Sequence, residues 1–296
     1  MTPTTVAALA AAKFNNFYLS SPLAGSNNMN NGFSAMQTKN EDVTSDRRVA
    51  LITGAGSGIG RAISLALARN GFSMALCGRR GAPLQAVADE IKGLGAHALA
   101  IPADASVPDA AEKAVTLTAD YFGRLDVLVN SAGYAPNVRA PDVTAQQWRE
   151  ILDVNLSSAF YLTRAAWPWL KRSAEAGASG SDARDQRPGC RSWVIYISSQ
   201  AARDPFPGLA IYGIAKAGLN MLTSIWDREG QPHGIGAFCI APGAVETEML
   251  RSLFSNEQVA PDDALMPEDV ADTVVQCVAG PLRYASGETL YIRRRP

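Results

Sequence analysis

The stretch from residue 48 to residue 70, RVALITGAGSGIGRAISLALARN, decides the fold of this chain. Its first part, residues 49–52, is a short, continuously apolar run, which is typical of a strand buried on both faces. A glycine-rich segment follows, Thr53-Gly54-Ala55-Gly56-Ser57-Gly58-Ile59-Gly60, and a helical pattern then covers residues 59–70. Strand, glycine-rich turn and helix in this order indicate the first unit of a parallel sheet with crossover helices.

Short apolar runs and helical patterns continue to alternate along the rest of the chain. The expected strands are 49–52, 72–77, 98–101, 127–130, 193–197, 237–240 and 290–292. The expected helices are 59–70, 83–94, 108–122, 148–170, 212–229 and 267–278. This alternation predicts an α/β fold: a doubly wound, Rossmann-like parallel sheet of about seven strands with helices on both faces.

Two segments interrupt this pattern. Residues 1–46 are rich in Asn, Ser and Thr and have no sustained period, so we predict a disordered N-terminal extension. Sequence upstream of a misassigned start codon, a partner-binding arm and a weak organellar transit peptide are the alternatives. Residues 173–192, SAEAGASGSDARDQRPGCRS, are small, polar and glycine-rich and predict a surface insertion. Residues 47–296 are otherwise expected to form a single domain.

Composition excludes several classes of protein. The chain has 296 residues, of which 47% are hydrophobic, and a formal net charge of -1, which argues against nucleic acid or an anionic membrane as partner. The basic stretch 293–295 is too short to change that conclusion. No apolar run approaches the roughly 18–20 residues that span a bilayer. Four cysteines without a CxxC pair and two histidines give no reason to expect a metal site or a disulfide framework, and they fit a reducing, cytoplasmic compartment.

The glycine-rich loop predicts a phosphate site. Glycines let the chain turn sharply and let backbone approach a ligand, while the helix N-terminus offers free N–H groups to a pyrophosphate. The second expected strand ends at Gly78 and is followed by Arg79 and Arg80, where an NAD-binding fold would carry an acid. Two guanidinium groups can instead bind a 2′-phosphate, so we predict NADP(H) rather than NAD. A solvated pair of turn residues is the alternative.

A second group of residues predicts acid–base chemistry. Tyr212 and Lys216 are four residues apart and share one face of the expected helix. An ordinary tyrosine has a pKa of about 10, and we expect the nearby ammonium, together with an oxidised nicotinamide, to lower it toward neutral pH. Ser198 and Ser199 follow the strand 193–197, at the sheet edge where parallel sheets bind ligands. A hydroxyl there can hydrogen-bond a substrate oxygen.

Together these motifs resemble the short-chain dehydrogenase/reductase family, in its compact single-domain form, over roughly residues 47–292. Besides the loop and the Ser/Tyr/Lys set, the resemblance rests on these motifs: Ala103-Asp104, Asn130-Ser131-Ala132-Gly133, Val154-Asn155-Leu156 and Pro242-Gly243-Ala244-Val245-Glu246-Thr247. It implies an NADP-dependent enzyme that moves a hydride between nicotinamide and a small alcohol or carbonyl compound.

The resemblance also implies roles for individual residues. Tyr212 would be the proton donor and acceptor, and Lys216 would lower its pKa and hold the nicotinamide ribose. Ser199, rather than Ser198, would bind the substrate oxygen, and Asn155 would keep a water in the proton relay. Asp104 would contact adenine, and Val245 and Thr247 would orient the nicotinamide. The full set of expected cofactor residues is Gly54, Ser57, Gly58, Ile59, Gly60, Arg79, Arg80, Asp104, Asn130, Ala132, Gly133, Tyr212, Lys216, Pro242, Gly243, Val245 and Thr247.

Departures from the family pattern leave assembly and substrate open. By similarity, the helices that carry Asn155 and Tyr212 would form a dimer interface, so a homodimer or homotetramer is expected. The C-terminus lacks the usual Gly-Gly ending, which puts the tetramer in doubt. The short segment after Thr247 suggests an open site or a modest lid, and Tyr134, Phe206 and Met249 are candidate wall residues. The alternatives are a non-catalytic NADP-binding scaffold or redox sensor and, less well supported, a sugar-nucleotide epimerase or dehydratase.

Overall fold

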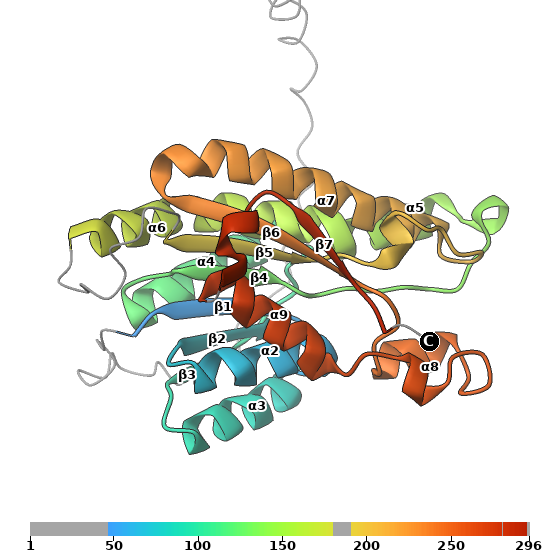
Figure 1. The fold of residues 1–296 in the computed structure, drawn as a ribbon, viewed down its shortest axis with the longest axis horizontal. Helices are drawn as coiled ribbons and strands as arrows, with labels where there is room; N and C mark the ends of the chain where they lie inside the picture. The colour runs from blue at the N-terminus through green and yellow to red at the C-terminus, as the bar shows by residue number, and fades with distance from the viewer. Residues whose placement is uncertain (1–46, 180–190, 280, 295–296) are drawn as a thin grey trace, which may run out of the picture. The chain divides into compact units, whose positions relative to one another are not determined.

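The computed structural model describes residues 47–179, 191–279 and 281–294 (Figure 1). Its centre is one sheet of seven strands in the order β3-β2-β1-β4-β5-β6-β7, and all neighbouring strands pair in parallel. The strands are β1 Val49–Thr53, β2 Ser73–Gly78, β3 Ala98–Pro102, β4 Val127–Asn130, β5 Ser192–Ile197, β6 Ile235–Pro242 and β7 Thr289–Ile292. The chain order reverses between β1 and β4, which is where open α/β sheets bind ligands. The predicted fold class is therefore confirmed.

Helices cover both faces of this sheet because alternate strand residues point to opposite sides. In β1, Ala50 and Ile52 pack in one core cluster with α2 Gly58–Arg69, α3 Gly81–Gly93 and α9 Pro267–Val278. Val49 and Leu51 pack in the other, with α4 Pro108–Phe122, α6 Ser158–Ser179 and α7 Ala210–Gly230. Strands buried on both faces explain the continuously apolar runs of the sequence.

The single helix expected over 148–170 is wrong in its bounds and continuity. α5 covers Ala145–Leu152, a π-helical turn covers Asp153–Ser157, and α6 begins at Ser158. Thr144 starts α5 earlier than expected, because its hydroxyl accepts a hydrogen bond from the Gln147 N–H while the Gln147 side chain accepts one from the Thr144 N–H, a reciprocal capping box. Apolar periodicity does not reveal a π turn, since it inserts only one extra residue into a continuous helix.

The surface insertion expected over 173–192 is also shorter than predicted. α6 continues through Ser179, with Ser173 and Ala174 buried, and Ser192 already belongs to β5. The Ser173 hydroxyl accepts a hydrogen bond from the Leu125 N–H at 3.3 Å. A small polar residue can therefore lie on the buried face of this helix, because its hydroxyl has a partner. Residues 180–190, like the N-terminal extension 1–46, lie outside the described part of the chain.

A short helix that the sequence analysis did not predict lies between β6 and α9. α8 covers Glu248–Leu253, and the Thr247 hydroxyl caps it by accepting a hydrogen bond from the Leu250 N–H at 3.2 Å. Six residues are too few for a helical period to stand out from chance. Within the described residues, none of the helices combines the length and apolar character needed to cross a membrane.

Candidate active site

Two adjoining cavities lie where β1, β2, β4, β5 and β6 reach their carboxyl ends. The first has a volume of about 470 Å³ and is lined by the glycine-rich loop and the ends of β2 and β3. The second has a volume of about 530 Å³ and is lined by residues that follow β5 and β6. Gly133, in the loop after β4, lines both, so the two form one site at the switch point of the sheet.

The glycine-rich loop needs its glycines for close backbone packing. Gly54 has φ +66°, and a Cβ there would lie 3.1 Å from backbone atoms of Ala132. A Cβ on Gly60 would lie 2.3 Å from the carbonyl oxygen of Gly54, which is impossible without opening the turn. α2 follows without a side-chain cap at Ser57 and without an acidic residue in its first turn. The positive end of this helix therefore faces the first cavity with no carboxylate competing for an anion.

Thr53 and Asn130 fix the neighbouring loops. The Thr53 hydroxyl accepts hydrogen bonds from the Ser131 and Ala132 N–H groups, both at 3.1 Å, which ties the end of β1 to the loop after β4. Asn130 is buried at the end of β4, where its amide lies 3.5 Å from the Thr163 hydroxyl. These contacts fix the loop after β4 on either side of its end. None of them involves Gly133, which lines both cavities.

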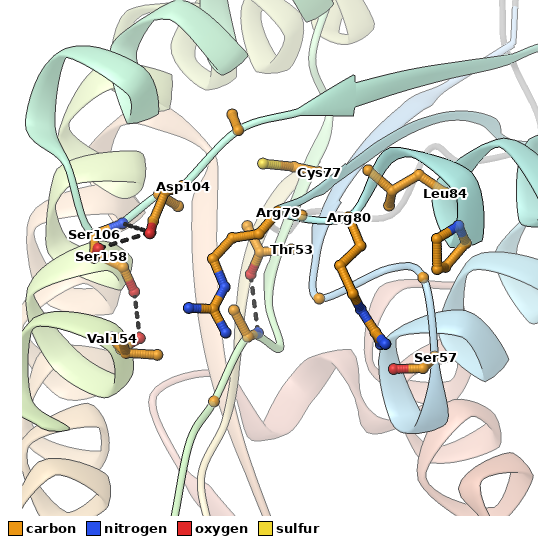
Figure 2. Close-up of a pocket in the computed structure, with 18 residues that line it drawn as sticks. Thr53, Ser57, Cys77, Arg79, Arg80, Leu84, Asp104, Ser106, Val154 and Ser158 are labelled. Carbon is orange, nitrogen blue, oxygen red and sulfur yellow. Dashed lines mark hydrogen bonds between the residues drawn. The ribbon is translucent and has the colours of Figure 1, made fainter. Parts of the chain in front are cut away.

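The far end of the first cavity carries charge. Figure 2 shows Arg79 and Arg80 extending from the end of β2 into this pocket, Arg80 in the direction of Ser57. Both arginines are exposed. Among the residues that the structure describes, neither forms an ion pair with a carboxylate. Asp104 lines the same pocket, and its Oδ1 accepts hydrogen bonds from the Ser106 N–H at 3.0 Å and the Ser106 hydroxyl at 2.7 Å. The carboxylate is therefore held in one orientation beside the two guanidinium groups.

In the second cavity the structure brings Ser199, Tyr212 and Lys216 together. The Ser199 side chain lies near enough to Tyr212 to act on the pKa of its hydroxyl, and the Ser199 hydroxyl accepts a hydrogen bond from the Ala201 N–H at 3.1 Å. Ser198 is buried instead and donates to the Lys216 carbonyl oxygen at 3.0 Å, which anchors α7 to the end of β5. Of the two serines, Ser199 is thus the one placed beside the tyrosine.

Burial dominates the electrostatics of Tyr212. It raises the pKa of Tyr212 above its ordinary value, and the nearby Ser199 side chain only partly opposes that rise. Lys216 is itself buried, which lowers its pKa to about 8. Its ammonium donates to the Ile197 carbonyl oxygen at 2.9 Å and lies 5.4 Å from the centroid of the Tyr212 ring. Without a bound cofactor, desolvation outweighs an ammonium that faces the ring and is bonded elsewhere, and a lowering of the tyrosine pKa beside an oxidised nicotinamide stays a prediction.

Asn155 approaches the same cluster from the π-helical turn. Its Nδ2 donates to the carbonyl oxygens of Tyr134 at 2.7 Å and Ile151 at 2.9 Å, and its Oδ1 accepts from the Tyr134 N–H at 3.1 Å. A Cβ on Gly133 would lie 3.2 Å from Asn155 Oδ1 and 3.5 Å from Lys216 Nζ. The Asn155 amide and the Lys216 ammonium therefore both lie close to Gly133. π turns of this kind are frequent at functional sites.

Comparison with known proteins identifies the family. Residues 48–258 match the family model described as short chain dehydrogenase. The chain belongs to the short-chain dehydrogenase family. As a short-chain dehydrogenase it is an oxidoreductase with a nucleotide-binding fold, so the resemblance inferred from the motifs is confirmed.

Individual relatives agree with this assignment over most of their length. A 3-oxoacyl-(acyl-carrier-protein) reductase of Staphylococcus aureus (strain Mu50) is 32% identical over 251 residues, which cover 82% of this chain and 95% of the relative. The crystal structure of a short chain dehydrogenase from Burkholderia cenocepacia J2315 in complex with NADP has a TM-score of 0.73 and 30% identity, and covers 84% and 97% of the two chains. A 3-ketoacyl-(acyl-carrier-protein) reductase from Brucella melitensis complexed with NADH has a TM-score of 0.73, 27% identity and coverage of 83% and 96%.

In this short-chain dehydrogenase one wall of the second cavity is formed by α8, which we call the lid. Met249, Leu250 and Leu253 of α8 line it, together with Phe206 from the loop before α7. Of the wall residues expected from sequence, Phe206 and Met249 line the cavity, whereas Tyr134 does not. Val245 and Thr247, which were expected to orient a nicotinamide, also line it, as do the expected cofactor residues Pro242 and Gly243.

Several residues of the second cavity were missed by the sequence analysis. They are Gln200, Leu209, Phe254, Gln258, Val259, Asp263, Arg293 and Arg294. Most lie in loops that carry no period, so no sequence pattern could have placed them at the site. The two arginines were visible as a short basic stretch, but nothing in the sequence indicated that the end of β7 reaches the cavity. In the part of the chain that is described, no group of His, Cys, Asp and Glu side chains is arranged to hold a metal ion.

Proposed function

We propose that this enzyme moves a hydride between NADP(H) and a small alcohol or carbonyl compound, with Tyr212 as its acid and base. The observation that carries the proposal is that Ser199, Tyr212 and Lys216 together line one cavity that adjoins a glycine-rich loop. A protein that only bound the dinucleotide would need the loop, but it would not need an acid, a hydroxyl and a buried ammonium in the second cavity.

The first cavity fits a dinucleotide phosphate. A Cβ on Gly54 or Gly60 would meet backbone atoms at 3.1 and 2.3 Å, so these glycines allow the tight turn that leads into the N-terminus of α2. The N-terminus of α2 suits a pyrophosphate, and Arg79 and Arg80 suit a 2′-phosphate. We assign adenine to the side of Asp104, and the nicotinamide ribose to Tyr212 and Lys216. When bound, NADP(H) would supply or accept the hydride.

The protein's own groups would then handle the proton. In carbonyl reduction the Tyr212 hydroxyl gives its proton to the substrate oxygen, and the Ser199 hydroxyl donates a second hydrogen bond to that oxygen as negative charge develops. Lys216 is charged below its pKa of about 8 and offsets the charge left on the phenol. Burial favours the protonated phenol, which is the form that reduction requires. Asn155 is assigned to hold a water in the proton path to Lys216.

A paired substrate screen tests this proposal. Ketones, aldehydes and 3-oxoacyl thioesters are offered with NADPH, and absorbance of the cofactor is followed for the unaltered enzyme and for Tyr212→Phe. We expect the single-turnover rate at saturating NADPH to fall by about 100-fold or more in Tyr212→Phe, as is typical for loss of a general acid. NADPH binding should survive, because only a hydroxyl is removed. Tyr134→Phe, which alters a ring outside the cavity, is the matched control, and a near-normal rate in Tyr212→Phe would rule out the assigned role.

We further propose that the enzyme is a homodimer. Ile214, Met221 and Ile225 are exposed along one stripe of α7, and Gly218 lies between them at helical spacing. Phe160 of α6 is exposed beside them in a shallow apolar groove that Gly218 and Met221 also line. A contiguous apolar surface of this kind is typical of an interface between subunits. A second copy that meets the same stripe around a two-fold axis would cover it.

A further inference from the structure

Two arginines at the end of β7 belong to the wall of the second cavity. Arg293 and Arg294 directly follow Ile292, whose carbonyl oxygen accepts a hydrogen bond from the Gly243 N–H at 2.8 Å. The Cβ of Arg293 lies only 3.2 Å from the position that a Cβ on Gly243 would occupy. Arg293 is therefore fixed against the turn that follows β6, and both arginines line the cavity that holds Tyr212.

Arg294 is held at the segment that follows the lid. Its Nη1 donates to the carbonyl oxygen of the buried residue Ala264 at 3.2 Å, and the next residue, Leu265, donates its N–H to the Ala244 carbonyl oxygen at 2.9 Å. A guanidinium has five N–H donors, so this single contact orients Arg294 and leaves most of its donors available. Across residues 47–179, 191–279 and 281–294, neither Arg293 nor Arg294 forms an ion pair.

The charges around the second cavity do not balance. Its lining is mostly apolar, and the charged residues in it are Lys216, Asp263, Arg293 and Arg294. Lys216 is buried and bonded to a backbone carbonyl, so it is committed to the reaction end of the cavity. That leaves one carboxylate against two guanidinium groups at the other end. Arg251 of the lid does not add to this excess, because it is paired with Glu246.

We propose that Arg293 and Arg294 bind an anionic group, a carboxylate or a phosphate ester, that the carbonyl substrate carries at a distance from its reacting carbon. The inference rests on the proposed function and adds a specificity determinant to it. Guanidinium groups present a planar fork that matches the oxygens of carboxylates and phosphates. The apolar residues that line the same cavity, among them Phe206 and Met249, suit the hydrocarbon part of such a substrate. Binding energy from a remote group orients the reacting carbonyl against the catalytic residues.

The cofactor is the other anion that these arginines could meet, but the geometry argues against it. Arg293 and Arg294 are absent from the lining of the first cavity, where the α2 N-terminus, Arg79 and Arg80 are assembled. The cofactor's phosphates thus have their own partners. The arginines line the second cavity on the side of the lid and of Gly243, and they also line a neighbouring cavity of about 760 Å³ beside Leu265 and Asp269. NADPH affinity in arginine variants distinguishes the two assignments.

The experiment uses matched pairs of anionic and neutral ketones. The probes are straight-chain keto carboxylates in which progressively more methylene groups separate the two functions, each paired with its methyl ester, and the phosphate monoesters of the corresponding keto alcohols. Calorimetry measures their binding to the full chain saturated with NADP+, and kcat/KM is measured wherever a probe is reduced. The variants are Arg293→Gln, Arg294→Gln and the double substitution. Arg228→Gln is the matched control, since this exposed arginine lies about 24 Å along α7 from Tyr212.

We expect at least one anionic probe to bind the unaltered protein about ten-fold or more tightly than its neutral partner, and the double variant to lose most of that preference. Arg228→Gln should keep the preference. Whether the carboxylate or the phosphate series shows it identifies the source of the anion. Tyr212→Phe separates the two proposals, because it should abolish reduction while keeping the preference in binding. Equal binding of anionic and neutral probes to the unaltered protein would overturn the inference, as would a loss in the arginine variants confined to NADPH affinity.

Discussion

Lys216 controls how the site responds to pH, because burial lowers its pKa to about 8. The groups that face it do not titrate in the same range. Burial raises the pKa of Tyr212 above its ordinary value and that of the Cys239 thiol to about 11. Between neutral pH and about pH 9, Lys216 is therefore the group in this cluster that changes charge.

We expect the dissociation constant of NADPH to be constant just above neutral pH and to rise as the pH passes through about 8, by up to about ten-fold per pH unit. The sign follows from the lowered pKa: the ammonium that holds the cofactor is present below about pH 8 and is lost above it. Fluorescence titration of NADPH over this range measures the effect, and the phosphate of the cofactor, with its second pKa near 6, is already ionised. Lys216→Met should bind more weakly at all these pH values and without the rise. A flat profile in the unaltered protein would show that Lys216 does not contribute its charge to cofactor binding.

Arg79 determines the choice between the two cofactors in our proposal. Arg79→Ala should weaken NADPH by about ten-fold or more, which is the scale of one charge-assisted contact, and should leave NADH almost unchanged. The comparison of the two affinities by titration cancels any general effect of the substitution. Arg69→Ala, at the exposed end of α2, is the control for loss of a positive charge. Equal affinity of the unaltered protein for NADPH and NADH would refute the assignment.

At the same scale, the sequence indicated which residues lie together at the candidate site but not the direction of their pKa shifts. Tyr212 and Lys216 could be paired from helical spacing, and the structure brings them together with Ser199. The direction of the Tyr212 pKa could not be predicted, because it depends on how much of the ring and of the ammonium is withdrawn from water. That burial depends on tertiary contacts, such as those of Lys216 with Ile197 and Ser198 at the end of β5, which no local pattern reveals.

Among the elements, the β1–α2 turn has the tightest packing in the site, and this makes it sensitive to a single methyl group. Gly60→Ala should lower both the free energy of unfolding and NADPH affinity, because its Cβ would lie 2.3 Å from the Gly54 carbonyl oxygen. Overpacking of this kind costs about 1–3 kcal/mol. Urea denaturation and NADPH titration measure the two effects. Gly93→Ala in α3 is the control, since a Cβ there meets nothing within 4 Å, and a Gly60→Ala protein as stable as Gly93→Ala would contradict the packing argument.

The elements differed in how well the sequence could predict them. The bounds of α4, β4 and α9 agree with the prediction at both ends, because Pro108 and Pro267 mark helix starts and the apolar run of β4 ends at Asn130. The π-helical turn at Asn155 and the helix α8 could not be predicted. One is a local change in hydrogen bonding within an apparently continuous helix, and the other is shorter than two helical turns. Both contribute to the site, which explains why the site was less predictable than the sheet.

At the scale of the whole molecule, the long helix α7 contributes both to the candidate active site and to the proposed dimer interface. One face carries Tyr212 and the buried Lys216, and another carries the exposed stripe that includes Met221. Leu156, in the same π-helical turn as Asn155, packs against Gly218, where a Cβ would lie 2.9 Å from the methyl groups of Leu156. A partner seated on the stripe would therefore press on the same helices that position the catalytic residues.

The last prediction follows from this arrangement. Met221 is 63% exposed at the centre of the stripe, so Met221→Glu should leave the monomer folded but place a charge in each half of a two-fold interface, twice per dimer. Sedimentation velocity should then report a monomer where the unaltered chain is a dimer. Leu94→Glu, at an equally apolar but isolated position 46% exposed at the end of α3, should not change the sedimentation. Because α7 also carries Tyr212, the Met221→Glu monomer should lose part of its activity, and that activity should recover at high protein concentration if the loss comes from dissociation. A Met221→Glu protein that sediments like the unaltered chain would show that subunits, if they associate, meet at another surface.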